Sequence, residues 1–151
     1  MAKTQKKDSG REELIQGLNE DLAREYQAVI AYVVYSQVLR GAQYMTIAKE
    51  LEVHAGEELQ HAITIAKHID YLGGTPTVTP KPVAPPKDAK QMLRADLDNE
   101  TDTIAQYRIR LRQAEALNEF AIAEDIREIL RQEQEHQIDL ATALDVDVPR
   151  N

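Results

Sequence analysis

The chain has 151 residues, of which 42% are hydrophobic, 29% charged and 5% aromatic, values typical of one globular domain with a single core. Its formal net charge of −8 argues against a body that wraps a nucleic acid, and it suits the attraction of cations. The absence of cysteine excludes disulfides, thiolate zinc sites and iron–sulfur clusters, so any transition metal must be bound through oxygen and nitrogen.

The amino-terminal segment, MAKTQKKDSG, contains no apolar stretch of the kind that a signal peptide requires. No other segment approaches the length and apolarity of a membrane span. We therefore expect a cytoplasmic protein with no membrane partner. The lysines of residues 1–8 predict a flexible basic tail, whose commonest role is to keep a protein soluble.

Apolar residues recur with the spacing of amphipathic helices in four segments. The predicted helices form one bundle domain over 9–146 and cover about 9–40, 42–72, 88–118 and 118–146. Ser9 and Glu12 have the spacing of a capping box at the start of the first helix, whose apolar stripe includes Val33 and Val38. Gly73 provides a C-terminal stop for the second helix.

The segment from 73 to 90 contains five of the six prolines and cannot lie within a helix. The second predicted helix would be about 46 Å long, whereas an extended linker of this length reaches about 56 Å. The linker can therefore return along the whole bundle, and Asp88 can cap the helix that follows it. We expect an all-α four-helix bundle with a long crossover between its second and third helices, and a short tail over 147–151.

The two halves of the chain repeat each other at an offset of 75 positions, a comparison that internal repeats call for. In each half, a Glu is followed 33 positions later by a second Glu, and a His follows the second Glu by three residues. The pairs are Glu25 with Glu100, Tyr32 with Tyr107, Glu58 with Glu133, and His61 with His136. The sequence therefore predicts a pseudo-twofold arrangement of the helices.

The four glutamates of this repeat each lie near the middle of a predicted helix, on its apolar side. A bundle would therefore bring four carboxylates and two imidazoles to one buried level. Four carboxylates buried without a cation would have to take up protons, whereas two divalent cations balance their charge and accept imidazole ligands. The alternative is a buried ion network that fixes helix register, but that network would place Arg or Lys on the same stripes, and we identify none there.

The segments REYQAVIAY, EELQH, QMLRADLDNE and REILRQEQEH resemble those of the ferritin-like di-iron carboxylate proteins, and among these the bacterioferritins most closely. The resemblance covers about residues 11–145. It implies six iron ligands: Glu25 and His61 terminal at one iron, Glu100 and His136 terminal at the other, and Glu58 and Glu133 bridging both. Tyr32 matches a tyrosine beside the site in that family, and an ordinary core tyrosine is an equally good interpretation.

The resemblance also implies ferroxidase activity, in which Fe(II) bound within one subunit is oxidised by O2 or H2O2 and is then stored or detoxified. Storage requires a hollow homo-oligomer, because one bundle cannot enclose a mineral. Two iron ions are the expected cofactors, and Mn or Zn can take the same ligands. The alternatives are a di-metal oxidase or peroxidase without mineral storage, and a mini-ferritin that associates with DNA through residues 1–8.

Three features differ from the bacterioferritin pattern. Leu59 stands where haem-binding members have a methionine, so haem is not expected. Val53 replaces a histidine that some members use for iron on the inner surface. The chain stops at DVDVPRN, without the short fifth helix of 24-subunit cages, which leaves the subunit number open between a dimer, a 12-mer and a 24-mer.

Two further histidines, His54 and His68, flank His61 at seven-residue spacing and share one side of the second predicted helix. For His54 we weigh a role as an accessory ligand against a hydrogen-bonded histidine, and we favour the second. For His68 we expect only packing near the helix end.

Overall fold

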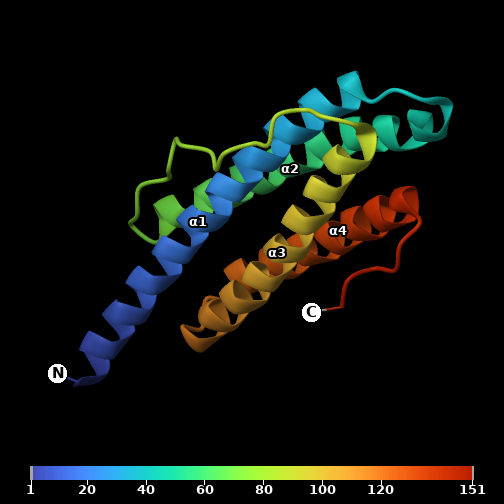
Figure 1. Cartoon of the computed structure of the whole chain (residues 1–151). Coiled ribbons are helices and arrows are strands. Elements are labelled where there is room, and N and C mark those ends of the chain that lie inside the picture. The colour runs from blue at the N-terminus through green and yellow to red at the C-terminus, as the bar shows by residue number, and fades with distance from the viewer. Residues whose placement is uncertain (1, 151) are drawn as a thin grey trace.

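The computed structural model describes residues 2–150, with side chains for residues 8–150. Within this range the chain forms four long α-helices, one short 3-10 helix and no strand (Figure 1). The elements are α1 (Ala2–Val38), the 3-10 helix η1 (Ala42–Tyr44), α2 (Met45–Tyr71), α3 (Ala89–Ala116) and α4 (Phe120–Leu144). The predicted all-α four-helix bundle is confirmed. In this described part of the chain, every helix falls short of the combined length and apolarity that crossing a bilayer requires.

The segment between α2 and α3 returns along α1 (Figure 1). The amide nitrogen of Thr77 donates to Asn19 Oδ1 over 2.7 Å, and the Tyr35 hydroxyl donates to the carbonyl oxygen of Ala84. These contacts are spread along α1, so the extended, proline-rich segment covers much of the length of that helix. The predicted long crossover is confirmed, and α2 and α3 run in the same direction (Figure 1).

Helix α1 begins earlier than the sequence predicted, because its backbone is helical from Ala2 rather than from Ser9. The added turns contain no glycine or proline, and their Ala, Lys and Gln residues favour a helix. Ser9 consequently lies inside the helix, where its hydroxyl donates to Glu13 Oε1 over 3.3 Å. The flexibility and the partners of the basic segment 1–8 stay predictions, since Met1 and the side chains of residues 1–7 lie outside the described residues.

Helix α2 ends at the predicted glycine stop. Gly73 has a φ of 89°, a left-handed conformation that glycine adopts readily, and its amide nitrogen donates to the Asp70 carbonyl oxygen over 2.9 Å. The amide nitrogen of Gly74 donates to the Ile69 carbonyl oxygen over 2.9 Å. These two bonds satisfy carbonyl groups that the end of a helix would otherwise leave without donors.

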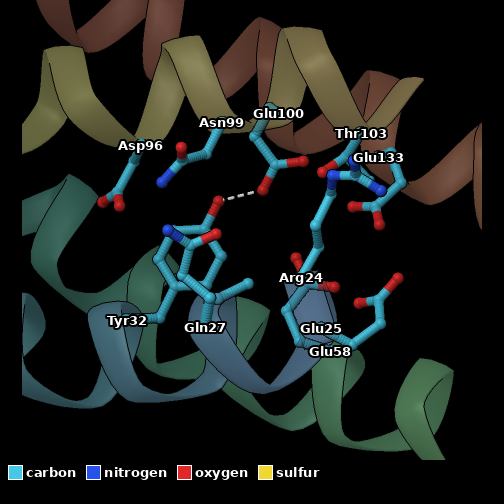
Figure 2. Close-up of a pocket in the computed structure, with 11 residues that line it drawn as sticks. Arg24, Glu25, Gln27, Tyr32, Glu58, Asp96, Asn99, Glu100, Thr103 and Glu133 are labelled. Atoms are coloured by element: carbon cyan, nitrogen blue, oxygen red, sulfur yellow. Dashed lines mark hydrogen bonds between the residues drawn. The ribbon is translucent and has the colours of Figure 1, made fainter. Parts of the chain in front are cut away.

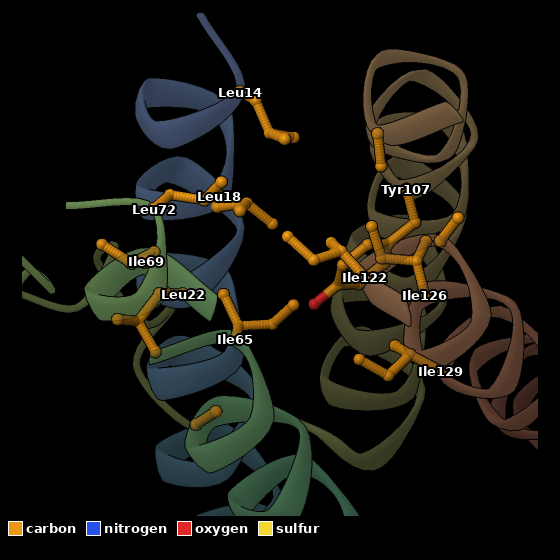
Figure 3. Close-up of a cluster of buried hydrophobic side chains, with 13 residues drawn as sticks. Leu14, Leu18, Leu22, Ile65, Ile69, Leu72, Tyr107, Ile122, Ile126 and Ile129 are labelled. Atoms are coloured by element: carbon orange, nitrogen blue, oxygen red, sulfur yellow. The ribbon is translucent and has the colours of Figure 1, made fainter. Parts of the chain in front are cut away.

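Two apolar cores fill the bundle, one toward each end. The first, the Leu14 core, is drawn in Figure 3 and includes Leu14, Leu18, Leu22, Ile65, Ile69, Ile122, Ile126 and Ile129. The second, the Leu51 core, includes Tyr32, Tyr35, Leu39, Ile47, Leu51, Leu93, Leu97 and Leu140. Along each helix the residues of one core are followed by buried polar residues and then by those of the other core. A polar layer therefore divides the apolar interior.

The predicted apolar stripe of α1 is wrong at Val33 and Val38, which are 52% and 37% exposed. Tyr32, Tyr35 and Leu39 occupy the interior positions in this part of the helix. Each of these buried residues lies one or two positions from one of the valines. A broad apolar stripe does not show which of two such neighbours faces the interior.

Asp88 is the N-cap of α3, and its Oδ1 atom accepts a hydrogen bond from the amide nitrogen of Gln91 over 3.0 Å. Replacing Asp88 with alanine removes this bond, so we expect the free energy of unfolding to fall by about 1 kcal/mol. Urea unfolding followed by circular dichroism measures the change. The control is Asp98→Ala on the same helix, where the side chain is 69% exposed; an equal loss in both variants would contradict the capping role.

Candidate metal centre

Six residues from all four long helices meet in the polar layer between the two cores. They are Glu25 of α1, Glu58 and His61 of α2, Glu100 of α3, and Glu133 and His136 of α4. None of them is more than 3% exposed. Figure 2 shows the four glutamates directed toward the space between the helices. The structure thus brings together all six residues that the sequence selected as candidate ligands.

The first donor group consists of Glu25, Glu58, His61 and Glu133, with one ligand atom from each lying within 4.8 Å of the others. His61 Nδ1 lies 2.9 Å from Glu58 Oε2 and 3.4 Å from Glu133 Oε1. Glu25 Oε2 lies 3.6 Å from the same nitrogen. Three carboxylates and one imidazole therefore face a common point.

The second donor group consists of Glu58, Glu100, Glu133 and His136, and here too one ligand atom from each lies within 4.8 Å of the others. His136 Nδ1 lies 3.0 Å from Glu58 Oε1 and 3.1 Å from Glu133 Oε2. Glu100 Oε1 lies 3.6 Å from this nitrogen. The two groups share Glu58 and Glu133, each of which presents one oxygen to either histidine. The predicted pseudo-twofold relation thus holds for the donor atoms.

The ligand atoms of these groups would be better satisfied by a divalent cation than by the contacts that they make with one another. Both carboxylate oxygens of Glu133 are buried and have no hydrogen-bond partner, an arrangement that proteins rarely leave uncompensated. The donors are oxygen and imidazole nitrogen only, the set that iron, manganese and zinc accept. Two overlapping groups that share two carboxylates are consistent with a di-metal site.

Without a cation, the site holds its charge in balance through protons. Burial raises the pKa of Glu58 well above its usual value, and the neighbouring carboxylates, Glu133 first, raise it further. Burial likewise raises the pKa of Glu100. Burial opposes protonation of His61 and His136, but the surrounding carboxylates outweigh it and raise both pKa values. Metal binding in this layer would therefore displace protons.

Two tyrosines support the outer carboxylates. The Tyr32 hydroxyl donates to Glu100 Oε1 (Figure 2), and the Tyr107 hydroxyl donates to Glu25 Oε1. Tyr32 was a sequence candidate, and the structure places it beside the second donor group. Tyr107 was not selected, although the repeat pairs it with Tyr32, so the offset between the halves already contained this signal.

Glu57 and Gln132 are functional candidates that the sequence reasoning missed. Glu57 Oε2 lies 2.5 Å from His136 Nε2, and Gln132 Oε1 lies 2.6 Å from His61 Nε2. Because an acceptor at Nε2 holds the proton on that nitrogen, each imidazole can present the lone pair of Nδ1 to the donor group. The two residues are mates at the repeat offset, but one is a carboxylate and the other an amide.

A buried basic residue lies one layer from the site, contrary to the sequence analysis, which identified none on the apolar stripes. Arg110 is 6% exposed, and its Nε atom donates to Asp21 Oδ2 over 2.7 Å. The guanidinium group packs against Gly17, where an added Cβ would lie 2.3 Å from Arg110 Cζ. Since the ion-pair partner of Arg110 is Asp21, the four glutamates of the donor groups are not neutralised by it.

The flanking histidines of α2 both contact carboxylates of α4. His54 Nε2 lies 3.2 Å from Asp139 Oδ2, as expected of a hydrogen-bonded histidine. His68 Nε2 lies 2.7 Å from Asp125 Oδ2, so its role exceeds the packing that the sequence suggested.

Comparisons with known proteins agree with this geometry. A model of the ferritin-like domain matches residues 15–147. The bacterioferritin of Brucella melitensis is 29% identical over 138 residues, which cover 91% of this chain and 86% of that protein. The bacterial ferritin of Paramagnetospirillum magnetotacticum is 31% identical over 101 residues, which cover 66% of this chain and 61% of that protein.

The fold is also found in solved structures, including the following two. A ferritin-like diiron-carboxylate protein from Bacillus anthracis has a TM-score of 0.86 at 34% identity, with 89% of this chain and 97% of that chain covered. A dodecameric thioferritin, the bacterioferritin-related protein from Bacteroides fragilis, has a TM-score of 0.82 at 28% identity, with 89% and 86% covered. Because the family match extends over residues 15–147 and includes both donor groups, the chain belongs to the ferritin-like domain family.

Proposed function

We propose that this protein is a ferroxidase that oxidises Fe(II) with O2 or H2O2 at a di-iron site within each subunit and serves iron storage and detoxification. The observation that carries the proposal is the pair of buried donor groups that share Glu58 and Glu133. The family membership of the chain supports it. Iron is the substrate here, so the protein's task is to collect two Fe(II) ions, hold them close together and release the oxidised product.

In this proposal the shared carboxylates bridge the two ions. Glu25 and His61 are the terminal ligands of one position, and Glu100 and His136 are those of the other. Four carboxylates and two neutral imidazoles balance the charge of two divalent ions. Because carboxylates are hard anionic donors, they stabilise Fe(III) more than Fe(II) and favour oxidation. Two Fe(II) ions supply two electrons, which reduce O2 to H2O2, or H2O2 to water, with the uptake of two protons.

The assembly of several subunits is also part of the proposal. The dodecameric structural neighbour supports a homo-oligomer, and a hollow cage would provide the volume for mineral. Large apolar side chains on the outer faces of α1 and α2 support association too: Val33 is 52% exposed, Leu59 53% and Ile63 55%. Leu59 and Ile63 are four residues apart and therefore lie on the same side of α2. Exposed apolar residues that adjoin one another are typical of contact surfaces.

The proposed activity predicts that Glu58→Gln slows the initial oxidation of Fe(II) at least about tenfold, since a neutral amide cannot bridge two ions as a carboxylate does. Stopped-flow absorbance of Fe(III) in air measures the rate, and size-exclusion chromatography with iron analysis measures storage. The control is Glu128→Gln on the surface of α4, where the side chain is 60% exposed. Equal rates in both variants and in the original chain would contradict the assigned site. Rapid oxidation without retained iron would point to a di-metal oxidase that stores no mineral.

Metal binding is also expected to stabilise the fold. A redox-inert ion such as Zn2+, at a hundred times its dissociation constant, should raise the free energy of unfolding by about 2.7 kcal/mol for each occupied position. Glu58→Gln combined with Glu133→Gln should remove most of this gain. Thermal unfolding with and without Zn2+ measures this gain, and an unchanged Zn2+ response in the double variant would contradict the shared ligands.

The Tyr107 hydroxyl predicts a further effect. Tyr107→Phe leaves Glu25 without its donor, so we expect metal affinity to fall by about 10-fold to 100-fold, the range found for residues that support ligands. Competition with a chromophoric chelator for Zn2+ measures the affinity. Tyr71→Phe is the control, because Tyr71 is 64% exposed and its hydroxyl contacts Glu119 over 3.3 Å, a residue that belongs to neither donor group. If both variants bind Zn2+ as tightly as the original chain, Tyr107 has no supporting role.

A further inference from the structure

A third group of metal-binding side chains lies outside the two donor groups, between α2 and α4. Glu50, His54 and Asp139 each place one ligand atom within 4.8 Å of the others. Glu50 and His54 are four residues apart on α2, so they project from the same side of the helix. Asp139 reaches the pair from α4, and its Oδ2 atom lies 3.2 Å from His54 Nε2.

His54 is buried, and only one of its two ring nitrogens, Nε2, has a polar contact. The residue is 2% exposed, and its Nδ1 atom has no hydrogen-bond partner. Its ring stacks on the His136 ring, with centroids 3.9 Å apart and planes at 23°. The stack fixes the orientation of the imidazole, so Nε2 is held toward the two carboxylates and does not rotate freely.

Solvent reaches these carboxylates through a groove between α2 and α4. The groove has a volume of about 210 Å³, and its walls include Glu50, Asp139, Gln43, Thr46 and Thr142. A water molecule occupies about 30 Å³ in the liquid, so the groove admits a hydrated ion. The lining consists of oxygen-bearing side chains with Ile47 and Ala143, and it contains no Lys or Arg that would repel a cation.

We propose that Glu50, His54 and Asp139 bind a third divalent cation, of the Fe(II), Mn(II), Co(II) or Zn(II) class, next to the di-metal site. Two carboxylates and a neutral imidazole carry a charge of −2, which one such ion balances. Two carboxylates with one imidazole are a ligand set that these ions accept, with water from the groove filling the remaining positions. The stacked rings of His54 and His136 place this ion beside the position that His136 serves.

The test counts the ions that each variant binds. Metal-free full-length protein is dialysed against excess Co(II), and the bound cobalt per chain is measured by mass spectrometry. Glu50→Gln combined with Asp139→Asn should bind one ion fewer than the original chain. The matched control is Glu52→Gln combined with Glu135→Gln, which changes two charges on the same helices; these side chains are 44% and 58% exposed, and no ion should be lost.

Anomalous scattering at the cobalt edge from crystals of the original chain should place the lost ion at the groove. Equal cobalt counts in the Glu50/Asp139 variant and the control would overturn the third site, and so would an absence of anomalous density beside Asp139. The site is separable from the proposed ferroxidase centre, because Glu58→Gln with Glu133→Gln should lose the di-metal ions and retain the cobalt at the groove. Loss of the groove ion from this last variant would also overturn an independent third site.

Discussion

The constraint on which the structure depends is the burial of four carboxylates at one level of a helix bundle. Two apolar cores enclose this level from either side, so water does not solvate the charges. Two imidazoles lie against the shared carboxylates and two phenols donate to the outer ones. Burying such a group without a counter-charge is strongly unfavourable. Without metal, protons on Glu58, Glu100 and the two imidazoles compensate the charge of this layer, and bound cations would take over that role.

The internal repeat accounts for how the layer is assembled, and the positions at which it fails show how the two halves of the site differ. The repeat holds for the ligand candidates and their tyrosines, but it fails one layer away. Asp21 and Asp96 are mates at the same offset; Asp21 pairs with Arg110, whereas one oxygen of buried Asp96 has no hydrogen-bond partner. Burial raises the pKa of Asp21 to about 6 even beside its arginine. The two positions of the centre thus have unequal surroundings, as they also do through Glu57 and Gln132.

Helical periodicity was sufficient to predict the bundle, and the length of the proline-rich linker was sufficient to predict its crossover. The repeat predicted the convergence of the six donors, because side chains at matched depths on four helices must meet. The remaining features depend on side-chain length and on contacts between helices. Arg110 is polar in sequence terms, yet it reaches a space that Gly17 leaves open. Glu57 and Gln132 are next to the ligands in sequence, but each contacts the histidine from the other half of the chain. Helical periodicity does not indicate contacts between helices of this kind. Only the repeat relates Glu57 to Gln132, because the two residues occupy equivalent positions in it.

The crossover divides the chain into two helical hairpins, α1 with α2 and α3 with α4, and neither hairpin contains a complete donor group. The first group takes Glu133 from the opposite hairpin, and the second takes Glu58. An ion in either position would therefore span the seam between the hairpins as a non-covalent cross-link. Because the two hairpins can separate along this seam without the unwinding of a helix, loading would hold them together, and the metal content of the protein would affect how readily proteases enter its interior.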